Sequence, residues 1–263
     1  MRSLLQFTHL DDRLYRKKIQ KGIYLYVNAQ DHIQSSIFWY GYYEKEVIQL
    51  WQSLIRPDSI VVDIGANVGY YTIIAAHKAA NGRVFSFEPF SKSYRQLQQN
   101  ISAARLQNVT AFPFAAGLQH GQQPFFVSGP GNTGMSGLTP AENYSGVTET
   151  VTVVSLDEWA AGAQLPAIDF IKIDIEGAEA MALQSMKEVM QKYRPVLFME
   201  VRAHLLKSFG QTVEGIYHLM AARQYTPYEV LPGSRLRKIS GCPEGDSIVF
   251  APQDYIFPTG IIV

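Results

Sequence analysis

The chain has 263 residues, of which 47% are hydrophobic and 17% are charged, a composition that supports a sizeable core and argues against intrinsic disorder. Its 23 basic and 23 acidic residues balance to a net charge of zero, so no overall electrostatic attraction to nucleic acid is expected. The single cysteine, Cys242, excludes an intrachain disulfide framework, an all-cysteine zinc site and an iron–sulfur cluster.

The hydropathy of the chain predicts a cytoplasmic protein with no membrane partner. The first apolar stretch is short and is followed at once by charged residues, which is not typical of a secretory signal. No window reaches the roughly 18 consecutive apolar residues that a membrane-spanning helix requires.

Residues 1–56 are expected to form an N-terminal cap segment, with a strand at residues 22–27 and a helix at residues 43–54 that covers a sheet. Within this segment we interpret a group of aromatic residues as core packing, with an acceptor pocket as the alternative: Trp39, Tyr40, Tyr42 and Tyr43. Residues 57–263 are expected to form the main domain, as a single compact unit with the cap.

The middle of the chain alternates short apolar runs with amphipathic stretches of helical spacing. The expected strands are residues 59–64, 83–88, 109–116, 168–175 and 196–201. The expected helices are residues 68–80, 91–105 and 178–193. This alternation predicts βαβ units and a parallel sheet.

The pattern changes after the fifth strand. A helix is expected at residues 212–223, followed by strands at residues 225–231 and 246–251 with only a polar loop between them. Two strands without an intervening helix predict an antiparallel pair at one edge of the sheet.

An insertion rich in Gly, Ser, Thr, Asn and Pro occupies residues 117–150. The runs 125–127 and 150–154 flank it and are expected to pair. A loop of this length in a compact domain is usually functional or mobile, although a tolerated surface insertion is the alternative. Ser155 and Glu158 then have the spacing of a capping box, which predicts the start of a short helix.

The most informative stretch is VVDIGANVGYYT at residues 61–72, where a buried strand ends in a turn containing Gly65 and Gly69. Such a turn allows a ligand to approach the backbone closely, and the helix after it offers unpaired N–H groups. The spacing differs from the dinucleotide fingerprint G-x-G-x-x-G, and no Gly-Lys-Ser/Thr follows as in a phosphate loop.

Two acids accompany this turn. Glu88 ends the second strand, where a carboxylate can accept hydrogen bonds from both hydroxyls of a ribose, and Asp63 can face a positively charged group. The alternatives are a solvated strand end for Glu88 and a turn acid for Asp63. Together the two acids indicate a nucleoside site without a diphosphate, and S-adenosylmethionine has the required adenosine, amino acid and sulfonium.

The stretch DIGANVGYYT (63–72) resembles motif I of class I S-adenosylmethionine-dependent methyltransferases, in the form used by the FkbM family. A second block, DFIKIDIEGAE (169–179), resembles the D-x-[IL]-K-[IL]-D-[IV]-E-G-x-E signature of that family. The resemblance covers residues 43–201 and is weaker in the C-terminal strands. It implies an α/β fold, the Rossmann-like class I methyltransferase fold, with a mostly parallel seven-stranded sheet and an antiparallel C-terminal edge pair.

By this resemblance, the cofactor S-adenosylmethionine would be bound by Asp63, Gly65, Asn67, Gly69, Glu88, Ala115, Ala116 and Asp174. Glu88 would hold the ribose, and Ala115 and Ala116 would border the adenine. Many class I enzymes have an Asp near those alanines, so here the adenine amino group would need backbone atoms or another residue. Asn67 has an alternative local role, because Asn tolerates strained turn conformations.

The second block carries the candidate chemistry. Lys172 and Asp174 share one face of an extended strand, Glu176 continues it, and the strand leads to the carboxyl edge where open α/β sheets bind ligands. We interpret Lys172 as the buried partner that neutralises Asp174 or Glu176, rather than as a base. Glu179 is interpreted as an acid favoured at a helix start.

A hydroxyl acceptor must lose a proton, which calls for a general base or a metal, whereas a carboxylate acceptor needs neither. The candidate catalytic residues are Asp174, Glu176, Glu200 and His204. Some class I O-methyltransferases hold a divalent metal with acids after the fourth and fifth strands, where Asp174 and Glu200 stand. Two acids do not make a metal site, so no metal ligands are assigned and a metal requirement stays open.

The resulting hypothesis is an S-adenosylmethionine-dependent O-methyltransferase that acts on a natural-product or sugar hydroxyl of a small molecule. The alternatives are methylation of a carboxylate on a peptide-derived natural product and a catalytically silent cofactor-binding protein. A nucleic-acid methyltransferase is disfavoured by the zero net charge and by the absence of an Asn-Pro-Pro-Tyr or Asp-Pro-Pro-Tyr stretch. A nicotinamide oxidoreductase is disfavoured by the glycine spacing, and the oligomeric state is not readable.

Overall fold

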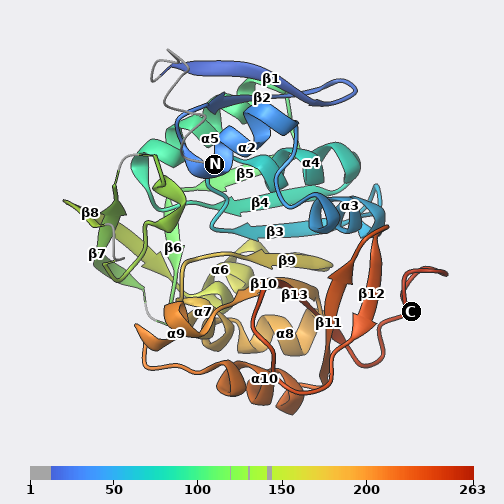
Figure 1. Ribbon diagram of the computed structural model, residues 1–263. Coiled ribbons are helices and arrows are strands. Elements are labelled where there is room, and N and C mark those ends of the chain that lie inside the picture. The colour runs from blue at the N-terminus through green and yellow to red at the C-terminus, as the bar shows by residue number, and fades with distance from the viewer. Residues whose placement is uncertain (1–12, 119, 130, 141–143) are drawn as a thin grey trace.

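The computed structural model describes residues 13–118, 120–129, 131–140 and 144–263. Its central element is an eight-stranded sheet in the order β12-β11-β13-β10-β9-β3-β4-β5 (Figure 1). Five neighbouring strands are parallel: β5 (Val109–Phe112), β4 (Arg83–Phe87), β3 (Ile60–Ile64), β9 (Phe170–Ile173) and β10 (Val196–Val201). The predicted α/β fold with a mostly parallel sheet is confirmed.

The other end of the sheet is antiparallel. There, β13 (Gly245–Pro252) pairs with β10 on one side and with β11 (Tyr225–Leu231) on the other, which confirms the predicted antiparallel pair. The edge strand is β12 (Arg235–Lys238), in a segment expected to be a loop, so the sheet has eight strands rather than seven. The polar sequence of β12 hides the strand, and only Leu236 is buried in it.

Successive residues of the central strands point to opposite faces, so the sheet has a hydrophobic core on each side. On one face Val61 and Phe170 pack with α3 (Lys45–Leu54) and α4 (Tyr70–Lys78). On the other face Val62 and Ile171 pack with four helices: α6 (Leu156–Ala163), α7 (Glu179–Ser185), α8 (Lys187–Tyr193) and α10 (Val213–Ala222).

The N-terminal part forms a two-stranded ribbon and a helix above the sheet (Figure 1). The ribbon consists of β1 (Leu14–Gln20) and β2 (Ile23–Asn28), and it lies near α2 (His32–Tyr40) and α5 (Ser91–Ala103). The predicted strand at residues 22–27 and helix at residues 43–54 therefore correspond to β2 and α3. Leu25 belongs to the same buried cluster as Val61, which ties the ribbon to the main sheet.

The expected third strand, residues 109–116, is divided at Pro113. Its second part, β6 (Phe114–Ala116), leaves the main sheet and pairs with β8 (Tyr144–Val154), which also pairs with β7 (Gly121–Ser128). The two runs predicted to pair lie in these neighbouring strands, but in a shifted register: residues 125–127 lie opposite residues 147–149, and residues 150–153 lie opposite residues 121–124. The insertion itself continues from β7 through a short turn of 3-10 helix, η1 (Thr133–Met135).

Two helix predictions need correction. The helix expected at residues 178–193 is two helices, α7 and α8, because the backbone of Met186 departs from helical geometry with φ −126°. Ser155 does precede α6, but its hydroxyl donates to the carbonyl oxygen of Ser185, 3.2 Å away, and does not cap the helix.

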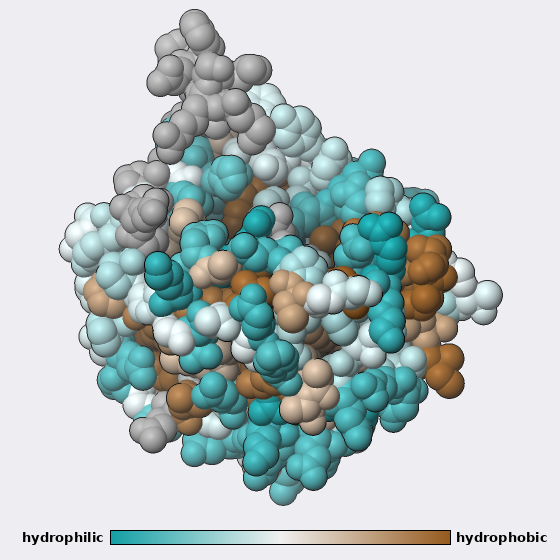
Figure 2. Space-filling model, turned by 60° about the horizontal axis from the view of Figure 1, so that its bottom comes forward, coloured by the Kyte–Doolittle hydropathy of each residue, from teal (hydrophilic) through white to brown (hydrophobic). Residues whose placement is uncertain are grey.

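The surface is largely polar on the face shown in Figure 2, where hydrophobic residues emerge in separate patches. Within the described part of the chain, no helix is both long enough and apolar enough to cross a membrane.

Candidate functional site

A cleft opens where β3, β4, β9 and β10 end, at the carboxyl edge of the parallel strands. It encloses about 1190 Å³ of empty space, including its open mouth. Nine of the predicted site residues line it: Asp63, Gly65, Asn67, Glu88, Ala115, Ala116, Asp174, Glu176 and Glu200. The topology of the sheet thus brings together side chains separated by more than a hundred positions in the sequence.

The turn between β3 and α4 forms the floor of the cleft. Gly65 has φ +82°, and a Cβ there would lie 1.9 Å from the carbonyl oxygen of Asp174. Only glycine fits, because the backbones of the β3 and β9 turns touch at this point. Asn67 also has positive φ, +49°, which fits the local turn role considered for it. Gly69 does not line the cleft; it begins α4, and a Cβ there would meet the side chain of Leu97 at 2.6 Å.

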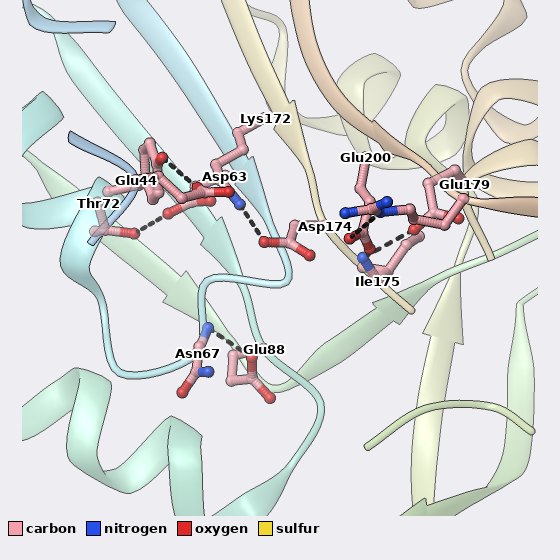
Figure 3. A network of polar contacts seen from close by, with 12 residues as sticks. Glu44, Asp63, Asn67, Thr72, Glu88, Lys172, Asp174, Ile175, Glu179 and Glu200 are labelled. Atoms are coloured by element: carbon pink, nitrogen blue, oxygen red, sulfur yellow. Dashed lines mark hydrogen bonds and ion pairs between the residues drawn. The ribbon is translucent and has the colours of Figure 1, made fainter. Parts of the chain in front are cut away.

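Glu88 is buried beside this turn with its carboxylate facing the cleft (Figure 3). Its Oε2 accepts from the backbone N–H of Asn67 at 2.7 Å, and its Oε1 accepts from that of Phe90 at 2.9 Å. Each oxygen keeps a second lone pair for a ligand. Burial raises the pKa of Glu88 to about 7 against these two hydrogen bonds. The Oδ1 of Asn67 is buried without a partner in the protein.

The rear of the cleft holds a buried ion network with one cation. The Nζ of Lys172 lies 2.7 Å from the Oδ2 of Asp174, and Lys172 also faces Asp63 and Glu44 (Figure 3). Burial by itself lowers the pKa of Lys172, but the three carboxylates outweigh it and the net shift is upward. The interpretation of Lys172 as a buried counter-ion therefore agrees with its position.

Only one of the two carboxylate oxygens of Asp63 has a hydrogen-bond partner in the protein. Its Oδ2 accepts from the Thr72 hydroxyl at 2.6 Å, whereas its Oδ1 is buried without a partner in the protein. Burial raises the pKa of Asp63, and Lys172 opposes this shift. A buried oxygen without a donor carries a free-energy cost, which a bound donor would remove.

Glu44 belongs to this network and was not anticipated from the sequence. Its Oε2 accepts from the hydroxyl of Tyr71 at 2.6 Å, and the Nζ of Lys172 sits 4.6 Å from the centre of the Tyr71 ring. Burial raises the pKa of Glu44, with Lys172 opposing. Glu44 has φ +46°, a left-handed conformation that is uncommon for a non-glycine residue.

The aromatic group before α3 was also misread. Trp39, Tyr40 and Tyr42 are 48%, 59% and 41% exposed, so the interpretation as core packing is wrong for them. Tyr43 lines the cleft beside Glu44. An aromatic-rich segment carries no signal that separates packing from exposure, because that depends on the neighbouring elements.

The open end of the cleft is strongly acidic. Burial, followed by repulsion from Asp174, raises the pKa of Glu176 to about 8 and that of Glu200 to about 9. The nearest described cation outside the cleft is Arg202, whose Nε lies 3.9 Å from the Oε1 of Glu200. The surroundings of both glutamates therefore favour the protonated form.

Glu179 has a structural position. Its Oε1 accepts from the backbone N–H groups of Ile175 and Gly177, each at 3.2 Å, and the residue is 2% exposed. It is thus at the helix start, as interpreted, but it closes the turn after β9 instead of facing solvent. Burial raises its pKa to about 7.

His204 does not reach the cleft. It is exposed on α9 (Ala203–Lys207), the short helix that follows β10. In the described part of the chain, no group of three or more His, Cys, Asp or Glu side chains has the arrangement of a metal site.

The far side of the cleft is apolar and is covered by the insertion. Ala115 and Ala116 lie beside Phe90 and Phe125, whose rings stack with centroids 6.3 Å apart. Thr133 of the insertion also lines the cleft. Its backbone N–H and hydroxyl both donate to the Oδ2 of Asp31, at 3.1 and 2.7 Å, which ties the insertion to the start of α2.

Residues 63–227 match the methyltransferase FkbM domain, and the chain belongs to this methyltransferase family. Its fold matches the crystal structure of methyltransferase FkbM from Methylobacillus flagellatus, with a TM-score of 0.50 and 16% identity, over 76% of this chain and 47% of that one.

Curated relatives share part of the chain. It is similar to the hexuronic acid methyltransferase AglP of Haloferax volcanii, with 28% identity over 154 residues, covering 59% of this chain and 61% of that protein. It is also similar to the 2-O-methyltransferase NoeI of Sinorhizobium fredii, with 26% identity over 159 residues, covering 56% and 65%. A match to the AMB antimetabolite synthetase AmbE of Pseudomonas aeruginosa, 28% identical over 160 residues, covers 59% of this chain and only 7% of that protein. The chain thus spans less than two thirds of each of these relatives.

Proposed function

We propose that the chain is an S-adenosylmethionine-dependent O-methyltransferase that acts on a hydroxyl of a small molecule, such as a natural product or a sugar. The observation that carries this proposal is the cleft that Glu88, Asp63 and Asp174 line together, in which the Oδ1 of Asp63 has no partner in the protein.

The residues of the cleft fit the cofactor. The Gly65 turn leaves room for close approach of a ligand, and Glu88 has free lone pairs for the two ribose hydroxyls. Ala115 and Ala116 would border the adenine. The buried Oδ1 of Asp63 offers an acceptor for a positively charged donor such as the amino group of the cofactor.

When bound, this cofactor supplies an electrophilic methyl group on a sulfonium. The protein orients the acceptor and removes a proton from its hydroxyl. We assign proton removal to Asp174, which Lys172 holds by the 2.7 Å ion pair at the mouth of the buried network. Glu176 and Glu200, whose pKa values are raised by burial, would donate hydrogen bonds to the acceptor in their protonated forms.

A hydroxyl acceptor is favoured over a carboxylate by the charges of the cleft. Its described lining has six acidic residues and one basic residue, Lys172, which is already engaged by Asp174. A carboxylate acceptor would therefore find no available cation in this lining, whereas a hydroxyl needs none. Among the relatives, the name of the 2-O-methyltransferase supports a hydroxyl acceptor, and that of the hexuronic acid methyltransferase supports a sugar that carries both hydroxyls and a carboxylate.

The proposal is tested by calorimetry with S-adenosylhomocysteine and NAD, followed by turnover of a panel of sugars and hydroxylated peptides measured as S-adenosylhomocysteine release. Asp174→Asn should lower turnover by roughly 10²–10⁴, with cofactor affinity nearly unchanged. The matched control is Asp254→Asn, which alters a carboxylate held by Arg194 in a 2.7 Å ion pair at the surface. Binding of NAD alone would refute the proposal, and cofactor binding without turnover on any acceptor would favour the silent cofactor-binding alternative.

A further inference from the structure

A second hollow adjoins the cleft, and Glu44 lines both. This second hollow, the side groove, is walled by the start of α3, by the β11–β12 hairpin and by the segment that leads into β13. Because one side chain borders both spaces, a molecule lying in the side groove would extend past Glu44 toward Asp174.

The side groove lies at the functional edge of the sheet. Gly245, which lines it, pairs with Val201 at the carboxyl end of β10, one residue after Glu200. Open α/β sheets bind ligands at this edge. An acceptor that enters here would reach the acid end of the cleft, while the opposite, apolar end stays available to the adenine.

The wall of the side groove is anchored. The hydroxyl of Tyr217 donates to the carbonyl oxygen of Pro243 at 2.9 Å, and the backbone N–H of Ala203 donates to the Oε2 of Glu244 at 2.7 Å. Both Pro243 and Glu244 line the groove, so the segment before β13 is fixed to α10 and to the start of α9.

Acidic residues outnumber basic ones along this route. In the side groove, four described glutamates, Glu44, Glu46, Glu229 and Glu244, face two bases, Arg237 and Lys238. One of these bases is already neutralised, since the Nε of Arg237 lies 2.6 Å from the Oε1 of Glu229. The cleft beyond has six acids and one lysine in its described lining.

We infer that the side groove is the distal binding site of the methyl acceptor, and that this acceptor is a hydroxylated molecule bearing a protonated amine. The inference rests on the proposed function and adds the route and the charge class of the acceptor. Glu44 acts as a positioning residue at the junction, held by the hydroxyl of Tyr71 and by Ser247. A cation that approaches Glu176 and Glu200 would favour their charged forms.

The experiment uses the full chain loaded with S-adenosylhomocysteine and three sugars that differ in charge: glucosamine, glucose and glucuronate. Ligand-observed NMR should show glucosamine binding about tenfold more tightly than glucose, the effect of one charge-assisted hydrogen bond, with glucuronate the weakest. Ser240→Trp places a large ring at an exposed position in the side groove and should weaken glucosamine binding at least tenfold. Gln253→Trp, exposed just beyond the other end of β13, is the control and should change nothing.

Calorimetry with S-adenosylhomocysteine on the same variants separates the two proposals. If the wild-type chain does not bind S-adenosylhomocysteine, the proposed function is refuted. If that binding is intact but glucosamine has no advantage over glucose, or binds Ser240→Trp as well as it binds the control, the inference about the side groove is overturned. Release of protons on glucosamine binding, seen as a heat that changes with the buffer, would support it further.

Discussion

Replacing Lys172 by methionine removes the one cation from the buried network and keeps most of the side-chain volume. Lys172 is 5% exposed, pairs with Asp174 at 2.7 Å and also faces Asp63 and Glu44. Breaking a buried ion pair by removing one partner costs about 3–5 kcal/mol, because the remaining charges lose their compensation. We therefore expect the free energy of unfolding to fall by about that amount, or the melting temperature by roughly ten degrees.

The loss should depend on pH. Burial already raises the pKa of Asp63 and of Glu44, and Lys172 opposes both shifts, so the substitution raises these pKa values further. A carboxyl whose pKa is higher in the folded state contributes stability at low pH and loses it as pH rises from its ordinary value, near 4, toward the folded one. The deficit of Lys172→Met should therefore be larger at pH 8 than at pH 5.

Urea unfolding at both pH values measures this deficit. The matched control is Arg237→Met, because Arg237 pairs with Glu229 at 2.6 Å but its side chain is 60% exposed. An exposed pair of this kind contributes little to stability, because solvent screens it. If Lys172→Met cost no more than Arg237→Met, or cost the same at pH 5 and pH 8, the view of Lys172 as the counter-ion of several buried carboxylates would be wrong.

Three further substitutions probe the floor, the ribose site and the cover of the cleft. Gly65→Ala should lower the free energy of unfolding in urea by about 1–3 kcal/mol more than Gly22→Ala does. Both glycines have positive φ, but only at Gly65 would a Cβ meet backbone atoms. Equal losses would contradict the close approach of the two backbone turns at Gly65. Glu88→Gln should weaken S-adenosylhomocysteine binding by about 1.5–3 kcal/mol in calorimetry with little change in melting temperature, and an unchanged affinity would remove the ribose assignment. Thr133→Val removes the 2.7 Å hydroxyl bond to Asp31 and should speed amide exchange of residues 131–138 about fivefold, whereas unaltered exchange would show that the backbone bond alone holds the cover.

Local sequence was sufficient to predict the strands and helices with clear hydrophobic periodicity and the turn with characteristic glycine spacing. The alternation of apolar runs with helical stretches predicted the five parallel strands, because strand and helix periods differ and a buried parallel strand is apolar throughout. The turn at Gly65 was equally readable, since its glycine spacing excludes the alternative phosphate sites. From these local signals, the acids at the ends of β3, β4, β9 and β10 were placed at one edge, and all of them line the cleft.

Segments with mixed or polar composition were not readable. β12 is polar apart from Leu236 and exists as a strand because β11 offers it a partner. The helix expected to cover residues 178–193 breaks at Met186, a position whose side chain suits a helix. In both cases a tertiary contact outweighs a weak local preference.

The sequence by itself determined the α/β class, the family block and five of the six acids that meet in the cleft, because those depend on short periodic patterns and on a shared sheet edge. Only the tertiary structure decided which groups complete the site. It placed Glu44 beside Lys172 and Tyr71, brought Thr133 to Asp31, and left His204 exposed on α9. These outcomes depend on how separate elements pack, and that packing determines burial, charge compensation and the pKa of each acid.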